Sequence, residues 1–191
     1  LTLFTAGEAE RITGLSTVMQ RDWRHRGFLP KNDGHARFDA FGLATMFVLK
    51  LFSDRGIGPQ FAEKITEITA RSVVWNALYS ADMFEGDFAE EVDPRLPPRS
   101  DRVQADVRRR QLWHSLGFPR LIPTRFLIVF ADGSEWWDQS IDAALENPRN
   151  AIAEKLAGPI IVLDQEALGD LLAERVGRPL VHIETTPDRP S

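Results

Sequence analysis

Two short segments near the start of the chain, joined by a tight turn, constrain its fold more than any other feature. Thr5, followed three residues later by Glu8, forms a capping box that predicts the start of a helix. Gly14 then turns the chain, and Ser16 can cap a second helix that stops at Gly27. Two capped helices around one turn predict a helix-turn-helix unit.

The second predicted helix has one face for packing and another that is free. Leu15, Met19 and Trp23 recur at four-residue spacing, which is typical of a buried stripe. We expect the other face to stay exposed and to be available for contacts with DNA. The spacing i, i+3, i+4 and i+7 places four polar or basic side chains there, namely Thr17, Gln20, Arg21 and Arg24.

A hairpin is predicted directly after this helix. Residues 28–30 and 36–38 flank a tip at 31–35, in which an Asp-Gly pair favours the positive backbone angles of a tight turn. We interpret this hairpin as a wing that lies against the flanking DNA backbone or minor groove. The wing residues expected to contact DNA are Lys31, His35 and Arg37.

The order helix, turn, helix, wing, followed by an apolar helix capped by Asp39, resembles the MerR-type winged-helix DNA-binding domain. The resemblance covers residues 3–80. Its matching positions are 5–8, 14–16, Arg21, Trp23, 27–30, Gly34, Arg37, Phe38, Gly56 and Ile57. It implies DNA contacts from Arg21 and Arg37. In this chain Arg37 directly precedes Phe38, whereas the family usually has one residue between the wing arginine and its aromatic neighbour.

The charge distribution agrees with DNA contacts from the N-terminal part alone. The net charge is −5, but residues 1–75 contain 10 Lys and Arg against 8 Asp and Glu, whereas residues 76–191 contain 13 against 20. Residues 11–37 concentrate the excess of basic side chains, which suits contacts with phosphate groups. Cysteine is absent, which excludes disulfides and thiolate sensing.

Another helix of the N-terminal part is predicted to start at Pro59. Apolar and small residues recur along it at a spacing that resembles a short coiled coil, suited either to the intramolecular core or to a partner subunit. These residues are Phe61, Ile65, Ile68, Ser72, Trp75 and Tyr79.

An acidic, proline-containing stretch at 82–101 predicts a linker between two domains. Residues 1–81 are expected to form the DNA-binding domain and to fold alone. A helix over 102–116 follows, and its Arg108-Arg109-Arg110 run could touch DNA or fold back on the linker.

Residues 102–191 are predicted to form a small α+β domain for oligomerisation or for binding a partner or effector. Apolar strands flank an Asp132-Gly133 turn, Asp164 caps a helix that Gly177 ends, and residues 180–184 form a final strand. Shorter helices are expected over 140–146 and 148–156, and a strand over 159–163. The fold class is therefore a mainly α winged helix-turn-helix followed by a small α+β domain.

Motifs that would indicate catalysis or a cofactor are missing from the sequence. It has no phosphate-binding glycine loop, no histidine pair at metal-ligand spacing and no nucleophile elbow. Asp138, Asp142 and Glu146 could share a helical face, but such spacing is usual for solvated surface. Three tryptophans could line a ligand pocket, although core packing is the preferred interpretation. They are Trp113, Trp136 and Trp137.

We therefore expect a sequence-specific bacterial transcription regulator without enzymatic activity, cofactor or metal. Its partners would be double-stranded DNA and a second copy of the chain, it would not contact a membrane, and its location would be cytoplasmic, on the nucleoid. Two alternatives are an excisionase-like protein that bends DNA, and an interaction module whose acidic half contacts the transcription machinery, including RNA polymerase. The residues expected to contact DNA are Ser16, Thr17, Gln20, Arg21, Arg24, Lys31, His35 and Arg37.

Overall fold

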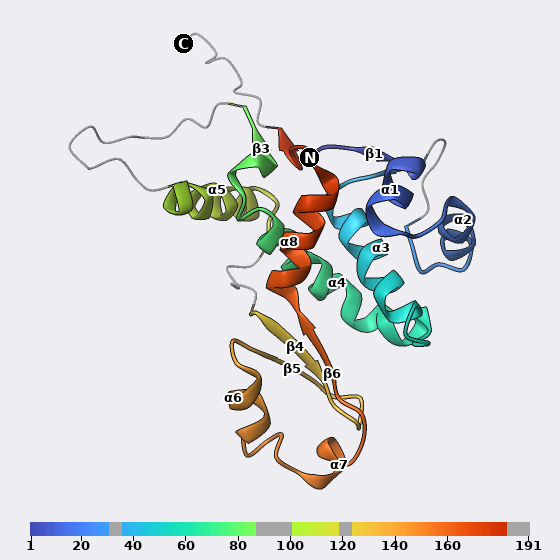
Figure 1. The fold of residues 1–191 in the computed structure, drawn as a ribbon, viewed down its shortest axis with the longest axis vertical. Helices are drawn as coiled ribbons and strands as arrows, with labels where there is room; N and C mark the ends of the chain where they lie inside the picture. Colours follow the sequence, from blue (N-terminus) through green and yellow to red (C-terminus); the bar gives the residue numbers. More distant parts are fainter. Residues whose placement is uncertain (31–35, 87–100, 119–123, 183–191) are drawn as a thin grey trace, which may run out of the picture.

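The computed structural model describes residues 1–30, 36–86, 101–118 and 124–182, which combine many helices with small sheets (Figure 1). The N-terminal elements are β1 (Phe4–Thr5), α1 (Ala6–Thr13), α2 (Thr17–His25), β2 (Arg37–Phe38), α3 (Ala40–Ser53), α4 (Pro59–Ala77), the short 3-10 helix η1 (Ala81–Met83) and β3 (Phe84–Glu85). The C-terminal elements are α5 (Asp101–Ser115), β4 (Phe126–Val129), β5 (Glu135–Asp138), α6 (Ile141–Glu146), α7 (Ala153–Leu156), β6 (Ile161–Asp164), α8 (Gln165–Val176) and β7 (Val181–His182).

The predicted helix ends of the N-terminal part are confirmed. Thr5 and Glu8 form the capping box of α1, and Gly14 follows α1 with a φ angle of 75°, in the left-handed region that favours glycine. The Ser16 side chain accepts a hydrogen bond from the Met19 N–H at the start of α2, and Asp39 caps α3 in the same way. The α1–turn–α2 unit thus has the local geometry that the sequence predicts.

The predicted wing hairpin is not what the described residues form. Strand β2 pairs with β1 in antiparallel register, with Phe4 opposite Phe38, while residues 28–30 form no strand and Phe28 and Leu29 lie in a bend. Both phenylalanines are buried, so the pairing adds their apolar side chains to the core. The predicted tip at 31–35 lies outside the described residues.

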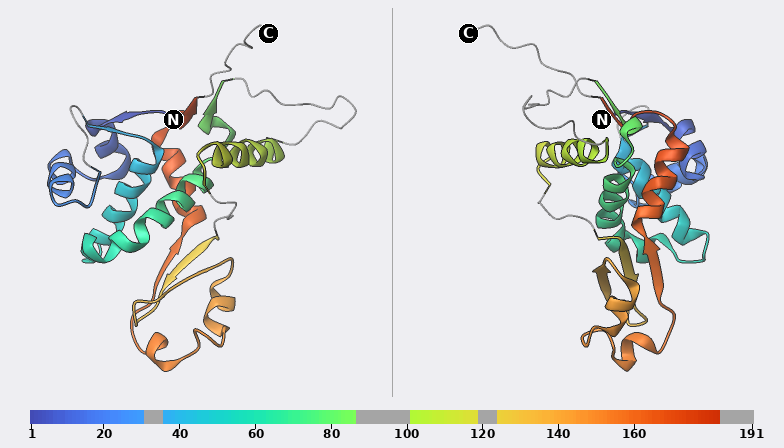
Figure 2. Two further views of the ribbon diagram at one scale, coloured as in Figure 1. Left: turned by 180° about the vertical axis from the view of Figure 1, so that it is seen from behind. Right: turned by 60° about the vertical axis from the view of Figure 1, so that its left-hand side comes forward.

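Helices α3, α4 and α8 pack together and form the centre of the molecule (Figures 1 and 2). A β-carbon added at Gly169 of α8 would lie 2.5 Å from the β-carbon of Asn76 in α4, which shows how closely the two helices approach. One buried core contains side chains from both ends of the chain, including Ile12, Leu43, Val74, Leu172, Val176 and Leu180. The core is therefore shared across the boundary that we predicted at 82–101.

The C-terminal sheet has the strand order β5-β4-β6 and is antiparallel throughout. The predicted Asp132-Gly133 turn is present: Gly133 has a φ angle of 80°, and the Asp132 side chain accepts hydrogen bonds from Ser134. Leu127 and Trp137 face the central core, whereas Ile128 and Trp136 face α6. The central strand β4 is thus covered on both faces, since Leu127 and Ile128 are both fully buried.

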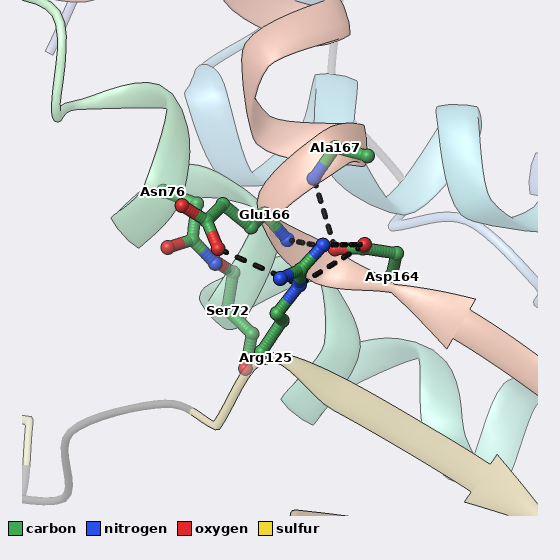
Figure 3. A network of polar contacts seen from close by, with 6 residues as sticks. All are labelled: Ser72, Asn76, Arg125, Asp164, Glu166 and Ala167. Carbon is green, nitrogen blue, oxygen red and sulfur yellow. Dashed lines mark hydrogen bonds and ion pairs between the residues drawn. The ribbon is translucent and has the colours of Figure 1, made fainter. Parts of the chain in front are cut away.

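A polar network joins this sheet to the start of α8 (Figure 3). The Arg125 guanidinium donates to the Asp164 carboxylate at 2.8 Å and forms an ion pair with Glu166 at 3.6 Å. The same Asp164 carboxylate caps α8 by accepting from the N–H groups of Glu166 and Ala167. Burial raises the pKa of Asp164, but the hydrogen bonds from Arg125 and from the helix outweigh it and lower the pKa overall.

The final strand and the basic run both differ in part from expectation. Strand β7 (Val181–His182) begins one residue after the predicted start at Leu180 and pairs in parallel with β3, while residues 183–184 of the predicted strand lie outside the described residues. In α5 the Arg109 side chain is buried: its guanidinium lies 4.4 Å from the Trp75 ring and donates to the Trp75 carbonyl. Arg109 therefore folds back on α4 rather than facing outward. Helix α7 is also shorter than the predicted 148–156.

Aromatic packing beside Arg109 bears out the preferred interpretation of Trp113. Its ring is buried, and its centre lies 5.0 Å from that of Trp75 in an edge-to-face arrangement.

Candidate nucleic-acid interface

Helix α2 lies at the periphery of the molecule and contacts the rest mainly through α1 (Figures 1 and 2). Its exposed side chains recur at i, i+1, i+4, i+5 and i+8, which forms one continuous stripe on a helix. We call this stripe the outer face of α2; it consists of Thr17, Val18, Arg21, Asp22 and His25.

The opposite face of α2 packs as predicted for Leu15, Met19 and Trp23, but it also includes Gln20. The expectation that Gln20 lies on the free face is wrong, since its side chain is 0% exposed. Its amide nitrogen donates to the carbonyls of Ala6 at 3.0 Å and Leu15 at 2.8 Å. Gln20 precedes Trp23 by three residues, so helical geometry places both on one side. This spacing was available in the sequence, but the polar side chain argued against burial.

The first turn of α2 already has partners for some of its backbone N–H groups. The Ser16 hydroxyl accepts from Met19, and the Glu10 carboxylate accepts from the Thr17 N–H at 3.0 Å. Ser16 thus acts as a cap, and a carboxylate occupies part of the helix N-terminus that a phosphate would otherwise reach. The side chains of the outer face are therefore the groups of α2 that remain accessible to a ligand.

Two further arginines predicted to contact DNA differ in their exposure. Arg24 is half-buried, because its Nε donates to the Gln20 carbonyl at 3.2 Å and its guanidinium lies over the Phe38 ring. Arg37 is exposed on β2. Arg21, on the outer face itself, is also exposed. Lys31 and His35 lie outside the described residues.

The outer face carries both signs of charge. Asp22 forms an ion pair with Arg26 at 3.5 Å, and the Arg26 guanidinium also lies over the Phe28 ring. The sequence prediction missed Val18, Asp22 and His25 as members of this face. His25 lies half a helical turn beyond Trp23, so the spacing of the buried stripe would have found it. Val18 and Asp22 directly precede Met19 and Trp23, so they lie at the edge of that stripe and the spacing alone did not reveal their exposure.

A residue that follows α8 contacts α1 and its capping box. Arg178, just after α8, forms an ion pair with Glu8 at 3.0 Å and stacks over the Phe4 ring. The pKa of the Glu8 carboxyl is lowered, first by the hydrogen bond from the Thr5 N–H and then by the Thr5 hydroxyl, with Arg178 contributing further. The capping box is therefore reinforced by a residue far away in the sequence.

Asp138, which the sequence offered as part of a carboxylate cluster, has a structural role in its own turn. The Asp138 carboxylate accepts hydrogen bonds from Trp136 Nε1 and from the N–H groups of Gln139 and Ser140, so it stabilises its own turn. Within the described ranges, no three histidine or carboxylate side chains are grouped to hold a metal ion. None of the helices in the described part of the chain has the length and apolar character that crossing a membrane requires.

No protein-family model matches this chain, and a search of curated proteins finds no match either.

Proposed function

We propose that this chain binds double-stranded DNA through the outer face of α2 and acts as a transcription regulator. The observation that carries the proposal is a capped helix at the periphery, anchored by a buried face and presenting an outer face of mostly polar and charged side chains, Arg21 among them. Such a helix has the dimensions of the DNA major groove, and its side chains can reach base edges. The resemblance of residues 3–80 to the MerR-type domain supports the same function.

In this proposal, Arg21 and Arg37 contact different parts of the DNA. Arg21 lies one turn after Thr17 on the outer face, where its guanidinium can bind a guanine edge or a phosphate. Arg37, on β2 beside the capping box of α1, would contact the neighbouring backbone. Gln20 is not part of the proposed interface, because its amide group donates both of its hydrogen bonds to carbonyls inside the fold.

We also propose that the chain binds DNA as a homodimer, because one helix-turn-helix reads too few base pairs for useful specificity. The seam predicted along α4 divides into two parts: Ile65, Ser72 and Trp75 are buried within the chain, whereas Phe61 and Ile68 are 44% and 46% exposed. Phe61 and Ile68 are seven residues apart and therefore share a face. They are the proposed contact surface for a second copy.

A titration with a matched charge control tests the DNA-binding proposal. Labelled duplexes enriched by the full chain from a random pool are titrated at fixed salt with wild type, Arg21→Ala and Arg149→Ala. Arg149 is an exposed arginine between α6 and α7, so its removal changes the net charge equally at a distant place. We expect Arg21→Ala to weaken binding by about 5- to 150-fold and Arg149→Ala to have little effect.

Two outcomes would contradict the proposal. Failure of the full chain to enrich any duplex would remove DNA binding, and equal losses in both variants would show only a general charge effect. Light scattering of the chain with and without the duplex tests the dimer, since a monomer mass in both would exclude it.

A further inference from the structure

We propose that Val18 determines sequence specificity by reading the 5-methyl group of a thymine in the major groove. This inference rests on the proposed binding of DNA by α2 and adds the base that one position of that helix recognises.

Val18 is the most exposed of the large apolar side chains in the described residues. It is 76% exposed, compared with 57% for Leu3 and 47% for Val103. Its place is the first turn of α2, the part of a recognition helix that reaches base edges. The other apolar side chains of α2 pack inward, so Val18 is the one apolar member of the outer face.

The surroundings of Val18 favour a base edge over a protein partner. A protein interface has an apolar centre made by several side chains, whereas the rest of this face is Thr17, Arg21, Asp22 and His25. A single methyl-sized apolar contact among hydrogen-bonding groups matches a thymine, since among the four bases only thymine presents a methyl group in the major groove.

The shape of the side chain also suits this role. Valine is branched at its β-carbon, so in a helix one χ1 rotamer is strongly preferred and little conformational freedom remains to be lost on contact. Its neighbours Thr17 and Arg21 can form hydrogen bonds to the adjacent bases or phosphates, which fixes the register in which Val18 meets the thymine.

The test removes the thymine methyl group and the Val18 side chain separately. Duplexes enriched by the full wild-type chain are resynthesised with uracil in place of each thymine, which deletes only the methyl group and keeps base pairing. Wild type and Val18→Ala are then titrated against each pair of duplexes. Val103→Ala, on α5, is the control for loss of an exposed valine elsewhere.

At one thymine of each half-site, we expect uracil to weaken wild-type binding by about fourfold, the equivalent of roughly 0.8 kcal/mol for one buried carbon group. Val18→Ala should bind the thymine and uracil duplexes equally, while Val103→Ala should discriminate between them as wild type does. Thermal unfolding should show that all three proteins are folded, because alanine at an exposed helical position is well tolerated.

The outcomes separate this inference from the proposed function. If duplexes are enriched but no thymine methyl affects wild-type binding, or if Val18→Ala still discriminates thymine from uracil, Val18 does not read thymine and DNA binding stands. If the full chain enriches no duplex, the proposed function and the role of Val18 are both overturned.

Discussion

The guanidinium of Arg175 in α8 donates a hydrogen bond to the carbonyl of Ile12 in α1, with a nitrogen–oxygen distance of 3.3 Å. Ile12 is in the last turn of α1, directly before the turn that leads to α2. A second hydrogen bond also joins the two ends of the chain, since the backbone N–H of Thr2 donates to the Leu180 carbonyl at 2.9 Å. The C-terminal part of the chain therefore helps to position α1 and the turn that leads to α2.

A first prediction concerns truncation at the predicted domain boundary. A fragment of residues 1–81 loses Leu172, Val176, Leu180 and Val181, all of which are buried. Burial of each such side chain stabilises a fold by about 1.5–3 kcal/mol, so their joint loss is comparable to the whole stability of a typical domain. We expect the fragment to show no cooperative thermal unfolding by circular dichroism.

The control for this truncation is a chain ending at residue 182, which keeps α8 and β7 and should unfold cooperatively. A cooperative transition in the 1–81 fragment, with a midpoint near that of the control, would show that the N-terminal part folds alone, as the sequence first suggested.

Gln20 gives a second prediction, which separates folding from DNA contact. Gln20→Ala removes two hydrogen bonds from the buried interface between α1 and α2 and leaves the Ala6 and Leu15 carbonyls without these donors. We expect a loss of about 1–3 kcal/mol in the free energy of unfolding, measured in urea. Arg21→Ala, one residue further along and exposed, should leave that free energy within about 0.5 kcal/mol of wild type. A neutral Gln20→Ala would contradict its structural role.

Features encoded within a few residues were predictable from the sequence. The caps made by Thr5, Ser16, Asp39 and Asp164 each depend on a side chain and an N–H group two or three positions away. The hairpin between β4 and β5 likewise depends on a short turn with glycine in the left-handed region. A helix cap or a tight turn of this kind allows few other backbone conformations.

Features that depend on distant parts of the chain were not predictable in this way. The partner of β2 is β1, more than thirty residues earlier, and a two-residue strand carries too little pattern to specify it. The proline-containing stretch indicated a boundary, yet α8 returns to α4 through the close approach at Gly169. In the candidate interface, Thr17 and Arg21 were placed on the outer face as observed, whereas the polar character of Gln20 concealed its burial.

The Glu8 carboxyl leads to a third prediction, on acid sensitivity. Hydrogen bonds from Thr5 lower its pKa in the folded state below the unfolded value, so the charged carboxylate contributes stability that is present at neutral pH and is lost as the pH falls through the folded-state pKa. Glu8→Gln keeps a capping oxygen but has no charge to lose. We expect the difference in melting temperature between wild type and Glu8→Gln to shrink on acidification.

Glu154→Gln provides the comparison for Glu8, because Glu154 is an exposed glutamate on α7. Its difference from wild type should be small at every pH. A gap between wild type and Glu8→Gln that stays constant from neutral to acid conditions would show that the capping carboxylate does not govern this sensitivity.

The last prediction tests the contact that joins the two ends of the chain. In Gly169→Ala the new β-carbon would meet the backbone nitrogen of Ala77 at 2.7 Å, so α4 and α8 must move apart. Alanine favours a helix by about 1 kcal/mol over glycine, but we expect a net loss of about 1–3 kcal/mol, because separation of two packed helices outweighs that gain. Gly7→Ala in α1 is the matched control, since no heavy atom lies within 4 Å of its added β-carbon, and it should be neutral or stabilising. Urea unfolding of both variants measures the difference. Equal stabilisation by both alanines would mean that α8 does not approach α4 this closely, and the contact that joins the two ends of the chain would then not be fixed.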